Sequence, residues 1–117
     1  MSEFNFKSAI CTSREQSERL LSLGLKKETA DCYLFEYEKG KYKVIVESWL
    51  DLMADEDYYP RFKDICTPAW SLNRMLCMLT AKRKCLLIRV KADLYDVLID
   101  RIEHEIKEGY FNKEYLV

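Results

Sequence analysis

The sequence predicts an α+β fold in which a small three-stranded sheet, made of a hairpin and one further strand, packs with about three helices. The spacing of apolar residues changes between the helical and the extended period along the chain, which gives the order helix, strand, strand, helix, strand, helix. The 117 residues fit one compact domain, residues 1–117, with 49% hydrophobic and 33% charged residues, a composition typical of globular domains. Three glycines and two prolines predict few long loops.

The first helix is predicted over residues 13–23. Thr12 stands three residues before Glu15, the spacing of a capping box, in which each side chain accepts a hydrogen bond from a free backbone N–H. Gly24 stands where a residue of left-handed backbone conformation ends many helices. Both ends of this helix are therefore marked in the sequence.

Residues 31–49 have the alternating pattern of a hairpin with Lys39 and Gly40 as its turn. One register satisfies both faces: it pairs Tyr37 with Tyr42, Phe35 with Val44 and Tyr33 with Val46 on one side, and Glu38 with Lys41, Glu36 with Lys43 and Leu34 with Ile45 on the other. The aromatic side is either the core face or a partly solvated interaction surface. The second alternative arises because buried tyrosine hydroxyls need hydrogen-bond partners. If the hairpin forms an edge of the sheet, this edge could pair with a second copy of the chain.

Residues 50–65 are irregular and acidic, and they predict a solvated connection with a short helical turn. Asp55 and Asp57 suggest a calcium loop. That interpretation fails, because the sixth and twelfth positions counted from Asp55 are Pro60 and Cys66 instead of glycine and glutamate.

The next helix is predicted from residue 68 or 71 to residue 80. In one alternative Thr67 caps it and Pro68 occupies its first position; in the other Ser71 is the cap, after a lead-in turn. Trp70 is then either buried in the core at the start of the helix or exposed at a contact surface.

A third strand is predicted over residues 85–91, after a basic turn. The last helix is predicted between Asp93, as its N-cap, and Gly109, as its stop, with apolar residues at helical spacing and a charged opposite side.

The residue inventory argues against several chemistries. Five cysteines, at positions 11, 32, 66, 77 and 85, form no Cys-x-x-Cys pair, and His104 is the single histidine, so no structural zinc site is expected. Three scattered glycines form no glycine-rich nucleotide loop. The chain shows no signal-peptide run and no segment of membrane-spanning length. We expect a cytoplasmic protein with free thiols and without cofactor, metal or membrane contact.

Four short motifs occur in order: Cys-Thr-Ser-Arg-Glu-Gln-Ser, Leu-Gly-Leu, Thr-Ala-Asp and Pro-Ala-Trp-Ser-Leu, at residues 11–17, 23–25, 29–31 and 68–72. In this combination the chain resembles a group of small uncharacterised proteins from prophages and other mobile elements of gut bacteria. The resemblance covers roughly the first eighty residues. It implies a bacterial, mobile-element setting and a compact accessory protein, and it assigns no active site.

Three functions follow from these observations. The leading hypothesis is a non-enzymatic accessory protein that binds another protein or itself, with Tyr33, Phe35, Tyr37, Tyr42 and Trp70 as its interaction surface. The second is nucleic-acid binding through Lys82, Arg83, Lys84, Arg89 and Lys91, although a net charge of −1 is low for this class. The third is a small enzyme with a nucleophilic cysteine and His104 as base.

Overall fold

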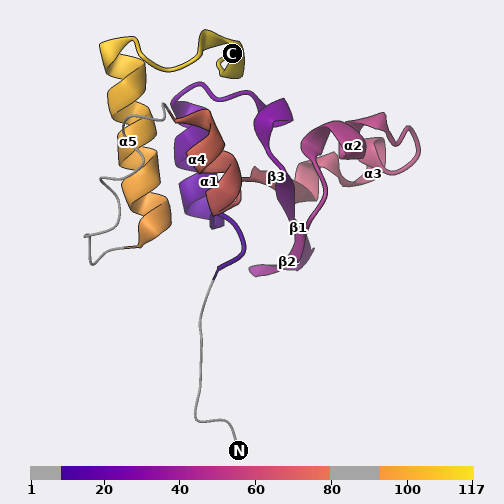
Figure 1. Cartoon of the computed structure of the whole chain (residues 1–117). Coiled ribbons are helices and arrows are strands. Elements are labelled where there is room, and N and C mark those ends of the chain that lie inside the picture. The colour runs from indigo at the N-terminus through magenta and orange to yellow at the C-terminus, as the bar shows by residue number, and fades with distance from the viewer. Residues whose placement is uncertain (1–8, 80–92) are drawn as a thin grey trace, which may run out of the picture.

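Figure 1 shows the computed structural model of the chain, which describes residues 9–79 and 93–117. Within these residues, three strands form one antiparallel sheet in the order β2-β1-β3 and five α-helices accompany it, which confirms the predicted α+β class. The elements are α1 (Arg14–Ser22), β1 (Cys32–Glu38), β2 (Lys41–Ile45), α2 (Trp49–Ala54), α3 (Tyr59–Phe62), β3 (Cys66–Ala69), α4 (Leu72–Met78) and α5 (Leu94–Glu108).

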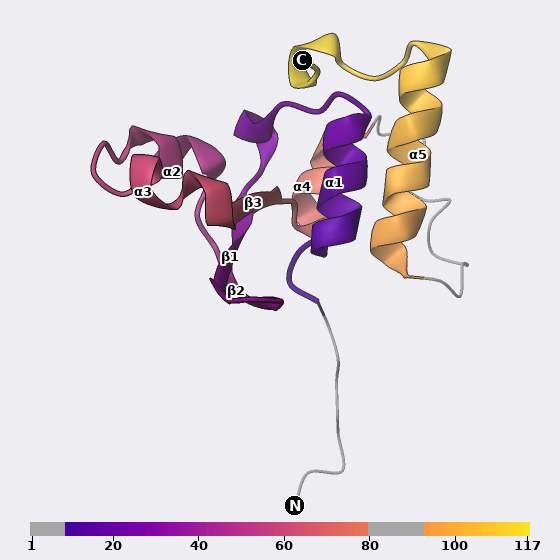
Figure 2. The ribbon, with the colours of Figure 1, turned by 180° about the vertical axis from the view of Figure 1, so that it is seen from behind.

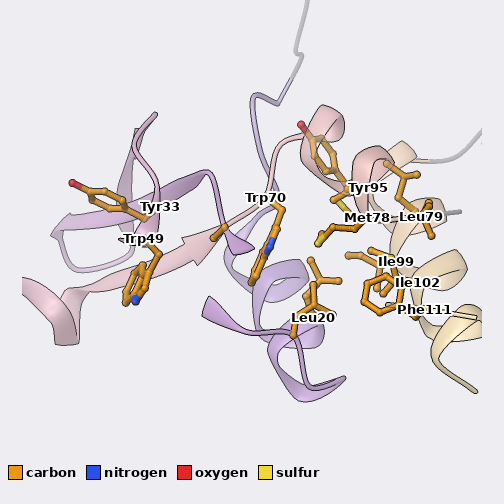
Figure 3. Packing of buried hydrophobic residues seen from close by; sticks show 14 of the residues in the cluster. Leu20, Tyr33, Trp49, Trp70, Met78, Leu79, Tyr95, Ile99, Ile102 and Phe111 are labelled. Carbon is orange, nitrogen blue, oxygen red and sulfur yellow. The ribbon is translucent and has the colours of Figure 1, made fainter. Parts of the chain in front are cut away.

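The sheet separates two helical groups. In Figures 1 and 2, α2 and α3 lie on one side of the strands, and α1, α4 and α5 lie on the other. One apolar cluster runs through both groups (Figure 3), from Trp49 and Tyr33 near α2, past Trp70, to Leu20 on α1 and Ile102 on α5. Trp49, Trp70, Leu20 and Ile102 are at most 1% exposed.

Helix α1 has the predicted position, but its cap is one residue further along than predicted. Ser13 is the N-cap, its hydroxyl accepts from the Gln16 backbone N–H, and the Gln16 side chain accepts from the Ser13 N–H. The predicted Thr12–Glu15 capping box is wrong because Thr12 is fully buried and its hydroxyl has core partners. The predicted stop is confirmed: Gly24 has φ = 101°.

The hairpin turns at Lys39 and Gly40 as predicted, and Lys41 Nζ lies 2.9 Å from Glu38 Oε2. A β-bulge between Glu36 and Glu38 then shifts the register by one residue. The predicted pairs of Tyr37 with Tyr42, Phe35 with Val44, Tyr33 with Val46, Glu36 with Lys43 and Leu34 with Ile45 are therefore wrong. The observed pairs are Tyr33 with Ile45, Leu34 with Val44, Phe35 with Lys43 and Glu36 with Tyr42.

The bulge has a packing consequence for both sides of the sheet. An extra residue in one strand changes which cross-strand neighbours share a face. Ile45 thereby joins Tyr33 on the side that packs in the main core with Trp49. Leu34 and Val44 face the other way, and Leu34 packs there with Cys11.

The third strand of the described sheet is β3, in a segment predicted to start or lead into a helix. Cys66 to Ala69 pair antiparallel with β1, with Pro68 opposite Tyr33. A proline is tolerated on an edge strand because its missing N–H can lie on the unpaired side. Helix α4 begins only after Ser71, whose hydroxyl accepts from the Arg74 N–H, so the Thr67–Pro68 start is wrong and the Ser71 cap is confirmed.

The strand predicted over residues 85–91 lies outside the described residues. Helix α5 has its predicted cap and stop: Asp93 accepts from the Tyr95 N–H, and Gly109 has φ = 81°. The acidic connection contains more helix than predicted, in α2 and α3. In the parts of the chain that the structure describes, no helix is long and apolar enough to cross a membrane.

Candidate interaction surface

The aromatic residues predicted to form one surface are divided between the core and the exterior. Trp70 is 0% and Tyr33 3% exposed, so both belong to the core, as the first alternative for each residue predicts. Phe35 and Tyr42 are half-buried. Tyr37, the bulged residue, is 56% exposed. The predicted aromatic face is therefore not one continuous exposed patch.

Three hydrogen bonds hold Trp70 in place. Its indole N–H donates to the Thr29 hydroxyl over 2.9 Å, and its backbone N–H donates to Thr12 Oγ1 over 3.1 Å. Its backbone carbonyl accepts from the Thr12 N–H over 3.0 Å. Thr12 Oγ1 is also 2.7 Å from Ser17 Oγ, inside the core. These bonds fix the N-terminal segment against the end of β3.

A second polar contact completes this network. The Asp31 carboxylate accepts from the Ser71 N–H over 2.9 Å and from the Ser71 hydroxyl over 2.5 Å. Segments 11–17, 29–31 and 68–72, which carry three of the four sequence motifs, therefore meet at one place in the fold. Because most of these groups are buried and paired, their arrangement explains how the chain folds and leaves no open site there.

The described cysteines show little sign of nucleophilic chemistry. Burial raises the pKa of Cys11 to about 12 and that of Cys66 to about 11. Burial and then the charge of Asp31 raise the pKa of Cys32, whose thiol is hydrogen-bonded to Cys11. A raised pKa leaves little thiolate, the reactive form. Cys77 is exposed on α4.

The remaining predicted site residues are placed as follows. His104 is exposed on α5, and within residues 9–79 and 93–117 no cluster of three or more metal-ligating side chains occurs. The predicted nucleic-acid contacts, Lys82, Arg83, Lys84, Arg89 and Lys91, and also Cys85, lie outside the described residues. Nucleic-acid binding stays a prediction.

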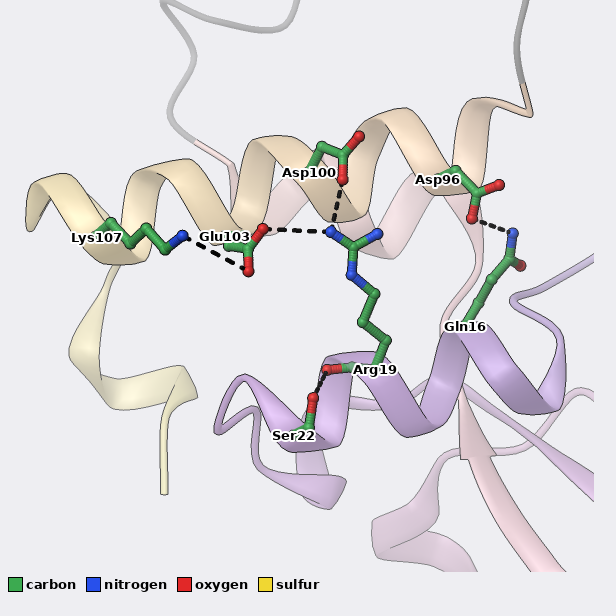
Figure 4. Close-up of polar contacts among 7 residues, drawn as sticks. All are labelled: Gln16, Arg19, Ser22, Asp96, Asp100, Glu103 and Lys107. Atoms are coloured by element: carbon green, nitrogen blue, oxygen red, sulfur yellow. Dashed lines mark hydrogen bonds and ion pairs between the residues drawn. The ribbon is translucent and has the colours of Figure 1, made fainter.

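The surface between α1 and α5 is already occupied by internal contacts (Figure 4). Arg19 on α1 reaches Asp100 over 2.6 Å and Glu103 over 3.3 Å, both on α5. Gln16 donates to Asp96 over 2.9 Å. These polar contacts connect the two helices along their length, so this face stabilises the fold.

The side of the sheet turned away from α2 is only partly covered. We call this side the outer face and define it by Leu34, Tyr42 and Val44. Arg14, at the start of α1, lies over the Tyr42 ring at 5.8 Å and donates to its hydroxyl. A groove of about 370 Å³ runs beside it, lined among others by Ile10, Leu34 and Val44. Ile10 is 60% and Val44 37% exposed, so apolar surface remains open there.

The outer face continues to a strand edge that pairs with no further strand within residues 9–79 and 93–117. β2 is the end strand of the sheet, and in Figures 1 and 2 it lies at the lower border of the described part. We call residues 41–46 the β2 edge. Val46 directly follows β2 and is 73% exposed. An edge strand presents unpaired backbone N–H and C=O groups, which are a template for pairing with another chain.

Sequence reasoning assigned the valines of this surface to the aromatic side and missed Ile10 altogether. Strand alternation correctly puts Tyr42, Val44 and Val46 on one side, but the bulge between Glu36 and Glu38 decides which β1 residues share that side. Comparisons with protein-family models, with curated proteins and with solved structures found no match for this chain. The site must therefore be interpreted from its own residues.

Proposed function

We propose that this protein is a non-enzymatic accessory protein that binds another protein molecule through the β2 edge and the adjoining outer face. The observation that carries the proposal is an edge strand that is unpaired on one side among the described residues, together with the exposed valines Val44 and Val46. Backbone hydrogen bonds to an added strand supply affinity, and pockets for alternate side chains supply specificity. The groove beside Val44 offers such a pocket.

Burial of three of the four described thiols supports binding over catalysis. A nucleophilic cysteine needs an accessible thiolate and a base within hydrogen-bond reach. Cys11, Cys32 and Cys66 are at most 7% exposed, and burial raises the pKa of each. The setting that we propose, the bacterial cytoplasm with a prophage or mobile element as the source of the gene, rests on the resemblance of the four motifs.

Photo-cross-linking from single positions tests the proposal. A photo-reactive phenylalanine analogue replaces Val46 at the β2 edge or, as the matched control, the exposed His104 on α5. We expect a discrete covalent adduct from position 46 in the cells that carry the gene, none from position 104, and loss of the adduct when Val44→Lys is added. The absence of an adduct at position 46, or equal adducts at both positions, would contradict the proposal.

A further inference from the structure

The described sheet has two edges that differ in their ability to accept a strand. β3 is four residues long and contains Pro68, which has no N–H to donate. β2, Lys41–Ile45, is one residue longer and contains no proline, and Val46 follows its last pair with β1. Short edges and prolines protect sheets from association. Of the two edges, β2 is the one suited to pairing.

The sequence of β2 is complementary to itself. We propose that two copies of this chain associate through their β2 edges, antiparallel, around a two-fold axis at Val44. The inference rests on the proposed function and names its partner, a second copy. In this register the opposing residues are Val44 with Val44, Tyr42 with Val46, Lys43 with Ile45 and Lys41 with Glu47 of the second copy.

This register places opposite charges at its two ends and apolar residues together on the outer face. Lys41 and Glu47 of the second copy carry opposite charges, which are favourable across an antiparallel pair. Within one copy Lys41 also pairs with Glu38, and Glu47, just beyond β2, accepts from the Tyr33 hydroxyl over 3.2 Å, so the contact between copies adds to these internal contacts. Tyr42, Val44 and Val46 of both copies form one apolar stripe. Val46 is 73% and Val44 37% exposed in the single chain, so pairing removes apolar surface from water.

Neighbouring registers lose this match. An axis at Lys43 places the two copies of Lys43 directly opposite each other, and such like-charge pairs are destabilising. A shift by one residue sets Lys43 against Val44 and puts the covered side of one sheet next to the outer face of the other. An axis at Ile45 would need Trp49 opposite Lys41, but Trp49 begins α2 and is 1% exposed.

The proposed association ends at two copies. A two-fold interface uses the same surface on both copies, so it ends at a dimer and does not grow into a fibre. The two three-stranded sheets then join into one six-stranded sheet in which neither β2 edge is free. The outer faces of both copies lie on the same side of this sheet.

Sedimentation equilibrium between about 1 and about 300 μM tests the proposal on the full chain. We expect a monomer–dimer equilibrium for the native protein and at least a tenfold weaker dimer for Val44→Lys. Charge exchange supplies a second test. Because Glu47 also accepts from the hydroxyl of the buried Tyr33, urea unfolding of each variant checks that it is folded. Lys41→Glu and Glu47→Lys each weaken the dimer, and the double variant restores it. A Lys43→Gln control, at a position without an opposing charge, leaves the dissociation constant within about twofold.

Disulfide trapping tests directly which residues of the two β2 strands lie opposite each other. Residues directly opposite across an antiparallel pair have Cα atoms about 4.5–5.5 Å apart, within disulfide range. In a background with Cys77→Ser and Cys85→Ser, Val44→Cys is expected to form a covalent dimer with oxidised glutathione. The two thiols become one disulfide, and the oxidant is reduced to two glutathione molecules. Val46→Cys is the matched control, because copies of position 46 lie about 13 Å apart in this register.

The results separate this inference from the proposed function. A monomer at every concentration, or a dimer unaffected by Val44→Lys, overturns the self-pairing. Efficient trapping at position 46 instead of 44 overturns the register. If the chain is monomeric and position 46 still cross-links to a different protein in cells, the proposed function stands and only the identity of the partner is wrong.

Discussion

The buried hydroxyl of Thr12 provides a quantitative test of the fold. Its Oγ1 accepts from the Trp70 backbone N–H and shares a hydrogen bond with the Ser17 hydroxyl, and all three residues are 0% exposed. Thr12→Val has nearly the same shape but leaves both groups without a partner. An unsatisfied buried polar group costs about 1–3 kcal/mol, so we expect a loss of about 3 kcal/mol in the free energy of unfolding.

Urea unfolding, followed by circular dichroism and tryptophan fluorescence, measures this change. The urea concentration at the midpoint of unfolding should fall, while the dependence of the free energy of unfolding on urea concentration stays constant. The melting temperature should fall by roughly 10 °C for a chain of this size. Thr12→Ser is the matched control: it keeps the hydroxyl, loses one methyl group and costs about 1 kcal/mol. Adding Ser17→Ala to Thr12→Val should cost less than the sum of the two single losses. A Thr12→Val protein within about 0.5 kcal/mol of the native one would refute the reasoning.

Four further predictions concern stability and thiol reactivity. Because burial raises the pKa of Cys11 to about 12, the folded chain keeps this proton where the unfolded chain loses it, so the free energy of unfolding should fall as pH rises above about 9 in urea titrations. At neutral pH, mass-spectrometric alkylation should label the exposed Cys77 before the buried Cys11, Cys32 and Cys66. Gly109→Ala should cost about 1 kcal/mol in thermal unfolding, because φ = 81° strains a residue with a side chain. Leu20→Ala should cost about 2–5 kcal/mol, whereas Arg19→Ala, which removes partly exposed ion pairs, should cost less than about 1 kcal/mol; a reversed order would contradict the proposed source of stability.

Elements whose ends carry their own signals could be predicted from the sequence. Gly24, Gly40 and Gly109 all have positive φ, and each stands at an end or turn that the sequence predicts. Asp93 caps α5 as expected. These signals are local: a glycine that tolerates left-handed backbone, or a side chain that reaches a free N–H, acts within one turn of the chain.

Features set by distant contacts could not be predicted in the same way. Thr12–Glu15 and Ser13–Gln16 both have capping-box spacing, and the pairing of Thr12 with Trp70, far along the chain, leaves Ser13 as the cap. β3 has only four residues, one of them Pro68, so its strand character depends on the edge of β1 that it completes. The bulge at Tyr37 has no sequence signal of the kind that marks a turn.

The candidate surface was predicted only in outline. The hairpin was recognised as a place for interaction, and Tyr37 and part of Tyr42 are indeed accessible. Its accessible apolar part is instead formed by Val44, Val46 and Ile10, because the bulge reverses which cross-strand partners share a side. A one-residue change in register therefore decides which residues a partner meets.

Amide hydrogen exchange of the β2 edge tests the central claim most directly. Within the described part of a single chain, the outward N–H groups of residues 41–46 have no partner strand. In the proposed dimer they are hydrogen-bonded to the second copy. We predict that exchange in this segment slows as the protein concentration rises from about 1 to about 300 μM, while β3 and the Val44→Lys variant show no such change. Exchange in residues 41–46 that is independent of concentration and identical to that of Val44→Lys would contradict the account.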